Sequence, residues 1–107
     1  MDSRSVVRRY YDALDDHEYD ALEDVLAPGF VQRRPDRSFP DRESFVRFMR
    51  EGRPNPNTTH ELVAIVGQGE TVAARGRVLD SDDPLFEFAD FFELEDGRIV
   101  ELETYSR

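Results

Sequence analysis

The spacing of the hydrophobic residues changes near residue 58, and this change constrains the fold more than any other feature of the chain. Before it, apolar side chains recur every three or four positions, as at Val6, Tyr10 and Leu14, which is typical of amphipathic helices. After it, apolar and polar residues alternate along extended segments, which is typical of β-strands. Helices followed by a run of strands predict an α+β fold.

Capping and turn residues predict where the elements begin and end. Ser3 or Ser5 is expected to cap the first helix and Asp41 the third, while Pro28-Gly29 ends the second. Because no linker or repeat interrupts the pattern, residues 1–107 are expected to form one domain. The predicted helices cover 3–14, 19–26 and 41–49, a short strand covers 30–34, and four antiparallel strands cover 58–66, 71–79, 85–94 and 98–105.

The composition excludes several chemistries. The chain has no cysteine, so disulfides, thiolate metal sites and cysteine nucleophiles are ruled out. It contains no apolar run of about 18 residues, the length of a membrane-spanning helix, and its N-terminal segment has no apolar signal region. We therefore expect a cytoplasmic protein with no membrane contact, and we expect neither a cofactor nor a bound metal.

The net charge is −10, from 24 acidic and 14 basic residues, and every basic residue is arginine. Such a surface repels phosphate backbones, so we expect no nucleic-acid partner. It also repels itself at low ionic strength, a repulsion that concentrated salt removes. We interpret this as a sign of a salt-loving host such as a halophilic archaeon; the alternative is an acidic protein from a GC-rich genome, which also favours arginine.

The turns between the long strands predict which residues face one another. A turn at 81–84 sets Arg75 opposite Asp90. Both side chains would then point to the same inward face as Phe92, because alternate residues share a face. Arg75 and Asp90 could equally form an ion pair that neutralises itself in the core. Other pairs expected from the turns include Arg77 with Phe88, Arg77 with His60, and Asp90 with Leu102.

Both faces of the first two long strands carry apolar residues, which predicts a sheet covered on both sides. Three helices can cover only one face. We expect the outer face to be covered by a second copy of the chain in a two-fold homodimer; the alternative is a scatter of exposed apolar residues. The residues assigned to this face are Val63, Ile65, Val72, Ala74 and Phe91.

Three segments, at 7–14, 72–76 and 89–100, together with the order of the elements, resemble the nuclear transport factor 2-like superfamily. That superfamily includes ketosteroid isomerase, scytalone dehydratase and the SnoaL-like polyketide cyclases. The resemblance implies a cone-like roll, with three N-terminal helices packed on a curved, mostly antiparallel sheet and a pocket at the open end. Its members include isomerases, dehydratases, cyclases, hydrolases and non-catalytic adaptors, so the likeness identifies a fold better than a function.

By position, Tyr10 and Asp90 resemble the tyrosine and the long-strand aspartate of ketosteroid isomerase. The position of that enzyme's base falls near Arg34, and an arginine cannot abstract a proton, so the isomerase chemistry does not carry over. The resemblance and the strand pairing together imply a pocket with an apolar wall and a few polar groups. The wall residues are Phe30, Phe45, Phe48, Phe88, Phe92 and Leu102, and the polar residues are Tyr10, Arg34, His60, Arg75, Arg77 and Asp90.

Three functions follow from these residues. The first is a cofactor-free isomerase, dehydratase or cyclase in which Asp90, His60 and Tyr10 act as acid–base groups. The second is a carrier that holds a small apolar or weakly acidic molecule, with Arg34 and Arg75 on its anionic group. The third is a dimeric adaptor with a vestigial pocket. The cluster Asp15-Asp16-His17-Glu18 has metal-binding residue types, but we interpret it as a solvated loop without metal.

Overall fold

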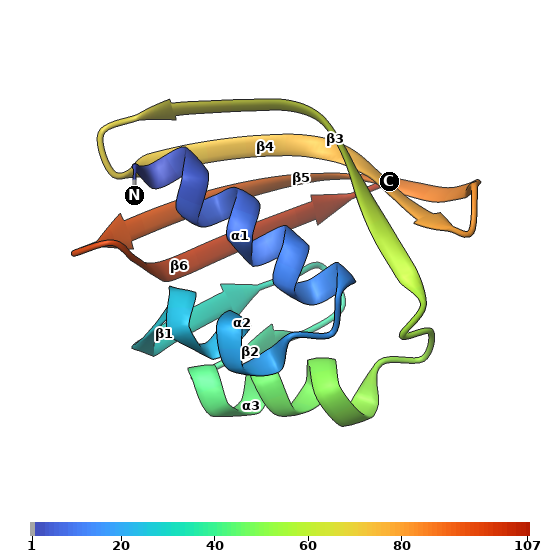
Figure 1. Ribbon diagram of the computed structural model, residues 1–107, viewed down its shortest axis with the longest axis horizontal. Helices are drawn as coiled ribbons and strands as arrows, with labels where there is room; N and C mark the ends of the chain where they lie inside the picture. Colours follow the sequence, from blue (N-terminus) through green and yellow to red (C-terminus); the bar gives the residue numbers. More distant parts are fainter. Residues whose placement is uncertain (1) are drawn as a thin grey trace.

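The computed structural model describes residues 2–107, which form one six-stranded sheet with three α-helices packed against one of its faces (Figure 1). The strand order is β2-β1-β6-β5-β4-β3; β1 runs parallel to β6, and all other neighbours are antiparallel. The α+β prediction with three helices is confirmed. The elements are α1 Ser3–Asp15, α2 Tyr19–Val25, β1 Leu26–Arg33, β2 Ser38–Phe39, α3 Arg42–Arg47 with a π-helical extension Phe48–Gly52, β3 Thr58–Gln68, β4 Thr71–Asp80, β5 Asp83–Glu95 and β6 Arg98–Ser106.

The starts of α1 and α3 are capped by aspartate side chains. Asp41 accepts a hydrogen bond from the backbone N–H of Ser44 at 2.7 Å, as predicted for an N-cap. At α1 the prediction was wrong: the cap is Asp2, which accepts from the backbone N–H of Ser5 at 2.8 Å. The second helix is followed at once by β1 from Leu26, so Pro28-Gly29 lies inside an irregular strand and does not end the helix.

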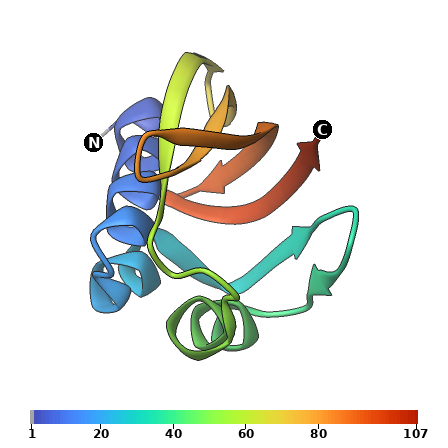
Figure 2. The same ribbon diagram turned by 90° about the vertical axis from the view of Figure 1, so that its right-hand side faces the viewer.

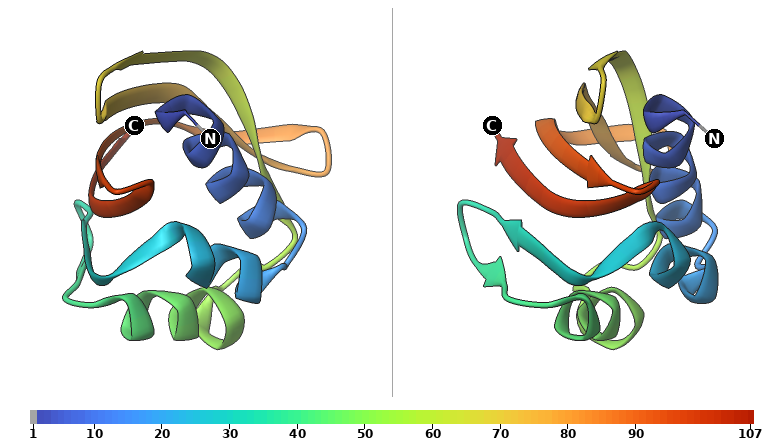
Figure 3. Two further views of the ribbon diagram at one scale, coloured as in Figure 1. Left: turned by 60° about the vertical axis from the view of Figure 1, so that its left-hand side comes forward. Right: turned by 90° about the vertical axis from the view of Figure 1, so that its left-hand side faces the viewer.

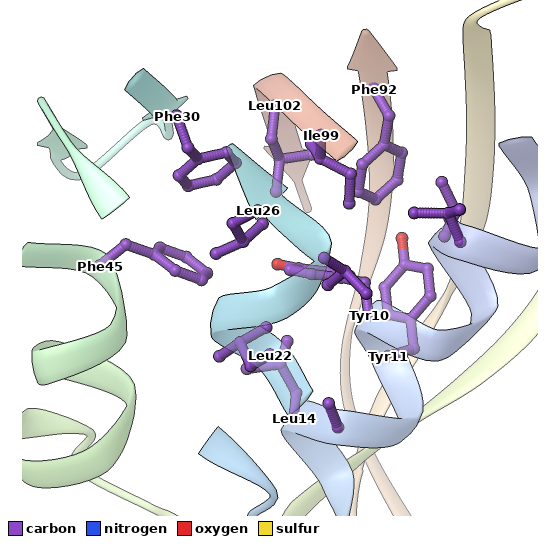
Figure 4. Close-up of a cluster of buried hydrophobic side chains, with 14 of the residues drawn as sticks. Tyr10, Tyr11, Leu14, Leu22, Leu26, Phe30, Phe45, Phe92, Ile99 and Leu102 are labelled. Atoms are coloured by element: carbon purple, nitrogen blue, oxygen red, sulfur yellow. The ribbon is translucent and has the colours of Figure 1, made fainter. Parts of the chain in front are cut away.

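The strands curl around the helices, and this curl creates the concave face on which the core is built. Figure 2 shows the bend of β5 and β6, and Figure 3 shows α1 lying against β3 while α3 lies against β1. The core fills the space between the helices and the concave face (Figure 4). Its largest fully buried side chains are Phe30, Phe45, Phe92, Leu22, Leu26, Ile99, Leu102, Val7 and Val72.

The pairing of β4 with β5 differs by one residue from the prediction. Ser81 and Asp82 alone form the turn between Asp80 and Asp83, and a bulge follows between Val78 and Leu79. As a result, Ala74 and not Arg75 lies opposite Asp90. A slip of one residue sends every side chain of a strand to the other face, so this difference decides which polar groups can meet.

The other two pairings were also predicted wrongly, with smaller consequences. Between β5 and β6 a shorter turn and a bulge together shift the register by two, so Asp90 faces Thr104 and Leu102 faces Phe92. A shift of two residues keeps the same face, so Leu102 still points into the core. Between β3 and β4, His60 lies opposite Val78 and not opposite Arg77.

A bulge at Val63 in β3 also redistributes the apolar residues between the two faces. After the bulge Ile65 faces the core while Val66 is 63% exposed on the convex side. Val72 and Ala74, which the alternation assigned to the outer face, are buried under α1. Only Val63 and Phe91 of the predicted outer set are exposed, at 48% and 47%.

Candidate functional site

A pocket of about 310 Å³ opens between the β1–β2 turn, the end of α3 and the starts of β3 and β5. Its wall is mostly apolar, and Asp90, Gln32 and Thr104 form a polar group within it. Of the residues that the sequence analysis assigned to a pocket, six line this one: Tyr10, Arg34, Phe48, His60, Phe88 and Asp90. Four residues predicted for its wall are instead part of the solid core, namely Phe30, Phe45, Phe92 and Leu102.

Asp90 is a buried carboxyl group, 5% exposed, on the concave face of β5. The hydroxyl of Tyr11 donates to its Oδ2 at 2.6 Å, and the hydroxyl of Thr104 donates to its Oδ1 at 2.7 Å. Burial raises the pKa of Asp90 above its ordinary value, while the two hydroxyl donors and the nearby His60 oppose this shift. The pocket therefore holds a carboxyl group whose proton affinity is increased and whose orientation is fixed.

Tyr11, and not Tyr10, is the tyrosine that reaches Asp90. The two residues are neighbours on α1, and Figure 4 shows their rings diverging, with the hydroxyls pointing in different directions. Tyr10 packs edge-on against Phe92 and lines the pocket. Burial, followed by the charge of Asp90, raises the pKa of both tyrosines, so both stay neutral and able to donate.

His60 is oriented by a carboxylate from the end of α1. Its Nδ1 lies 2.6 Å from Asp15 Oδ1, and its backbone N–H donates to Asp15 Oδ2 at 2.9 Å. The imidazole also packs against the rings of Tyr11 and Phe88. With a proton on Nδ1 donated to Asp15, Nε2 is left to act on a molecule in the pocket that His60 lines.

The loop that follows Asp15 does not gather metal ligands. His17 Nε2 lies 2.6 Å from the backbone oxygen of Pro56, which ties the loop to the segment before β3. Within residues 2–107 no group of three or more His, Asp or Glu side chains is arranged to hold a metal ion. Asp15 contributes to the pocket by orienting the His60 side chain.

The mouth of the pocket carries arginines. Arg34 donates to Asp36, with its Nε 3.0 Å from Oδ1, and Arg37 approaches the same carboxylate at 3.4 Å. Arg53 donates to neutral partners, the backbone oxygen of Met49 and the hydroxyl of Tyr19. The rim thus carries three guanidinium groups but one paired carboxylate, which Arg34 and Arg37 share. It has an excess of positive charge on a chain whose net charge is −10.

Arg75 and Arg77 do not belong to this pocket, contrary to the prediction. The one-residue difference in register turns both to the convex face, where Arg77 pairs with Glu61 at 3.0 Å. Arg75 lies opposite Ala89, beside a shallow hollow of about 210 Å³ that Tyr105 also lines. The predicted ion pair between Arg75 and Asp90 is therefore absent, and two hydroxyl groups take its place.

Gln32, Thr104 and Asp15 were missed as site residues, although the sequence contained a signal for each. Gln32 lies two positions after Phe30 on β1, and Thr104 lies two positions after Leu102 on β6. Each therefore points to the same inward face as a core residue. Asp15 lies one helical turn after Tyr11 and faces the same way.

Comparisons with known proteins bear on the fold and the family. A family model described as the SnoaL-like domain matches residues 7–102. No curated protein matches the sequence. No helix within residues 2–107 is long and apolar enough to cross a membrane.

Three solved structures share the fold at low sequence identity. One, from Kribbella flavida, is provisionally assigned as a ketosteroid isomerase; it has a TM-score of 0.88 and 19% identity, over 98% of this chain and 77% of that one. A provisionally assigned polyketide cyclase from Sinorhizobium meliloti has a TM-score of 0.81 and 22% identity, over 94% and 93% of the two chains. An LEH-like epoxide hydrolase from M. tuberculosis has a TM-score of 0.78 and 19% identity, over 96% and 80%.

Proposed function

Because the chain belongs to the SnoaL-like domain family, we propose that it is a cofactor-free enzyme that transfers protons to and from a small, mostly apolar substrate. The observation that carries this proposal is the presence of Asp90 and a His60 held by Asp15 in one pocket. Structures with this fold carry the descriptions isomerase, cyclase and epoxide hydrolase, which supports a small-molecule reaction but does not choose among them.

The two titratable groups have different environments, which suits them to different roles. Burial raises the pKa of Asp90, so this carboxylate is a stronger base than an ordinary aspartate and takes a proton from the substrate. His60, as an imidazolium with its Nδ1–H on the Asp15 carboxylate, donates a proton from Nε2 to a departing or developing oxygen. In a dehydration, Asp90 takes the proton from carbon and His60 protonates the hydroxyl group, which leaves as water. In an isomerisation, His60 stabilises the developing enol oxygen and Asp90 returns its proton to a second carbon of the substrate.

An uncharged substrate fits the site best. Arg34, which follows β1 directly, forms an ion pair with Asp36. Arg75 lies on the convex face of the sheet. The wall around Asp90 is formed by aromatic and aliphatic side chains. Among those that line the pocket are Leu14, Phe48, Met49, Val78, Leu85, Phe86 and Phe88.

The test is a panel of bicyclic β-hydroxyketones and β,γ-unsaturated ketones, whose dehydration or isomerisation gives a conjugated enone with a strong ultraviolet band. Asp90→Asn and His60→Gln should each lower kcat/KM by about 100-fold or more. Arg77→Gln, on the convex face, is the control and should leave the rate unchanged. No turnover by the wild-type protein, or equal turnover by Asp90→Asn, would remove the proposal.

A second candidate is a carrier for a weakly acidic apolar molecule, and the positive rim favours it. Arg53 has no carboxylate partner among residues 2–107, so it can meet an anionic group at the mouth. 1-Naphthoic acid should then bind without being converted, and Arg53→Gln should weaken it about fivefold. Equal affinity for 1-naphthoic acid and naphthalene would exclude this function.

We also propose that the convex face of the sheet is covered by a second copy of the chain. Val63, Val66, Phe91 and Tyr105 are exposed there. Arg75 has no ion-pair partner among residues 2–107. Glu103 on the neighbouring strand β6 lies opposite Phe91. A two-fold contact can therefore set Arg75 of one copy against Glu103 of the second copy while it buries the apolar side chains.

A further inference from the structure

The side-chain oxygen of Gln32 is an acceptor that the protein does not satisfy. Gln32 is 4% exposed, and among residues 2–107 its Oε1 is the one buried side-chain polar atom without a hydrogen-bond partner. Unpaired buried acceptors are unfavourable, and native proteins rarely keep them without a reason. Since Gln32 lines the pocket, the missing partner can come from a bound molecule.

The neighbouring hydroxyl group fixes which end of the Gln32 amide faces Thr104. Thr104 has one hydroxyl proton, and it donates this proton to Asp90 Oδ1 at 2.7 Å. The same oxygen can therefore only accept from Gln32, which it does from Nε2 at 2.9 Å. Turning the amide would set Oε1 against an oxygen with no proton left to give, so Oε1 stays directed away from Thr104.

The donors around the pocket do not supply the missing partner. Tyr11 is committed to Asp90 Oδ2, and Arg34 donates to Asp36. Tyr10 also lines the pocket, but its hydroxyl does not donate to Gln32 Oε1. The lining of the pocket as a whole is mostly apolar. A ligand group that donates a hydrogen bond is therefore what the corner lacks.

We infer that Gln32 Oε1 is the recognition point for a hydroxyl group on an otherwise apolar ligand, so that the pocket selects hydroxylated compounds over their methyl counterparts. This inference rests on the proposed function of the pocket and narrows its substrate class. A hydroxyl group bound to Oε1 shares the polar corner with Thr104 and Asp90, so recognition also brings a substrate oxygen to the acid–base residues.

The experiment compares the binding of 2-naphthol with that of 2-methylnaphthalene, which has the same shape but no hydroxyl donor. Affinities are measured by calorimetry at pH 7 for the wild-type protein, for Gln32→Met and for the control Gln68→Met. Gln68 is exposed at the end of β3, away from the pocket. The preference for 2-naphthol should fall about tenfold in Gln32→Met, the size expected for one buried hydrogen bond, and should not change in Gln68→Met.

A measurement on the wild-type protein keeps the inference testable if Gln32→Met does not fold. The ¹³Cδ resonance of the Gln32 carbonyl should shift with 2-naphthol and stay in place with 2-methylnaphthalene. Equal preference in wild type and Gln32→Met, or equal ¹³Cδ shifts with both compounds, overturns the inference but leaves the pocket intact. Failure of both compounds to bind the wild-type protein overturns both the inference and the proposed function.

Discussion

The carboxylate of Asp15 accepts two hydrogen bonds from His60, one from Nδ1 at 2.6 Å and one from the backbone N–H at 2.9 Å. This pair joins the last residue of α1 to the start of β3, across 45 positions of sequence. It holds the imidazole in one orientation and places the ring against Tyr11. One carboxylate thereby positions a pocket residue and fastens a helix to the edge strand of the sheet.

Replacing Asp15 tests both effects of this pair. Asp15→Asn should lower the free energy of unfolding by about 1–2 kcal/mol, because the charge-assisted bonds to His60 are weakened in a partly buried position. The measurement is urea unfolding followed by circular dichroism. Asp16→Asn, at the exposed neighbouring position, is the matched control and should change little. Equal effects of the two substitutions would show that the contact with His60 adds no stability.

The buried carboxyl group predicts a pH-dependent stability difference between the wild-type protein and Asp90→Asn. The pKa of Asp90 is raised above its ordinary 3.8, so the native state binds this proton more tightly than the unfolded chain does. Its stabilising contribution is complete below pH 3.8 and is lost as the pH rises through the native-state pKa. The stability of Asp90→Asn relative to wild type should therefore increase with pH over that window, by up to about 1.4 kcal/mol per pH unit.

Urea unfolding of both proteins between pH 3 and pH 8 measures this difference. Asp24→Asn, an exposed substitution on α2, controls for the general effect of losing one negative charge. A difference between Asp90→Asn and wild type that does not vary with pH would mean that the carboxyl group is not desolvated in the folded protein.

Gly76 marks the closest approach of two strands, and a side chain there should not be tolerated. A Cβ atom at position 76 would lie 2.1 Å from the backbone oxygen of Glu61 on the paired strand β3. Because a backbone atom cannot move aside as a side chain can, Gly76→Ala should destabilise the protein by at least about 2 kcal/mol. Gly29→Ala, where a Cβ atom would meet nothing within 4 Å, is the control. Equal melting temperatures for the two variants would contradict this prediction.

The proposed homodimer predicts the mass of the protein in solution. Light scattering should give twice the chain mass of 12.4 kDa for the wild type. Phe91→Arg, at the centre of the exposed apolar face, should give the mass of the single chain, because it buries an unpaired charge in the contact. Glu70→Arg, in the β3–β4 turn, should leave the dimer intact. A wild-type protein that is monomeric at high concentration would end the proposal.

The net charge predicts a response to salt. Raising KCl from 0.1 M to 3 M shortens the Debye length from about 10 Å to less than about 3 Å, so the repulsion among the excess carboxylates is screened. The melting temperature should rise by about 5 °C or more. Calorimetry across the salt series provides the measurement, and an unchanged Tm would favour the GC-rich genome as the reason for the arginine content.

The sequence alone determined the three helices, the four long strands and their order, because hydrophobic periodicity and capping are local properties of the chain. It did not predict the two-residue strand β2, where a loop was expected. It also assigned Asp90 to the concave face, since a strand residue's face follows from its parity with core residues such as Phe92. His60 was assigned to the same face through a pairing with Arg77, and it lies there because the one-residue differences in the β3–β4 and β4–β5 registers cancel. The partners of Asp90 depended on tertiary structure. A bulge and a two-residue turn move Arg75 to the convex face, and a two-residue shift brings Thr104 to Asp90. Such shifts arise from non-local pairing and twist, and so does the contact of Asp15 with His60, which requires the curled sheet to bring β3 against the end of α1.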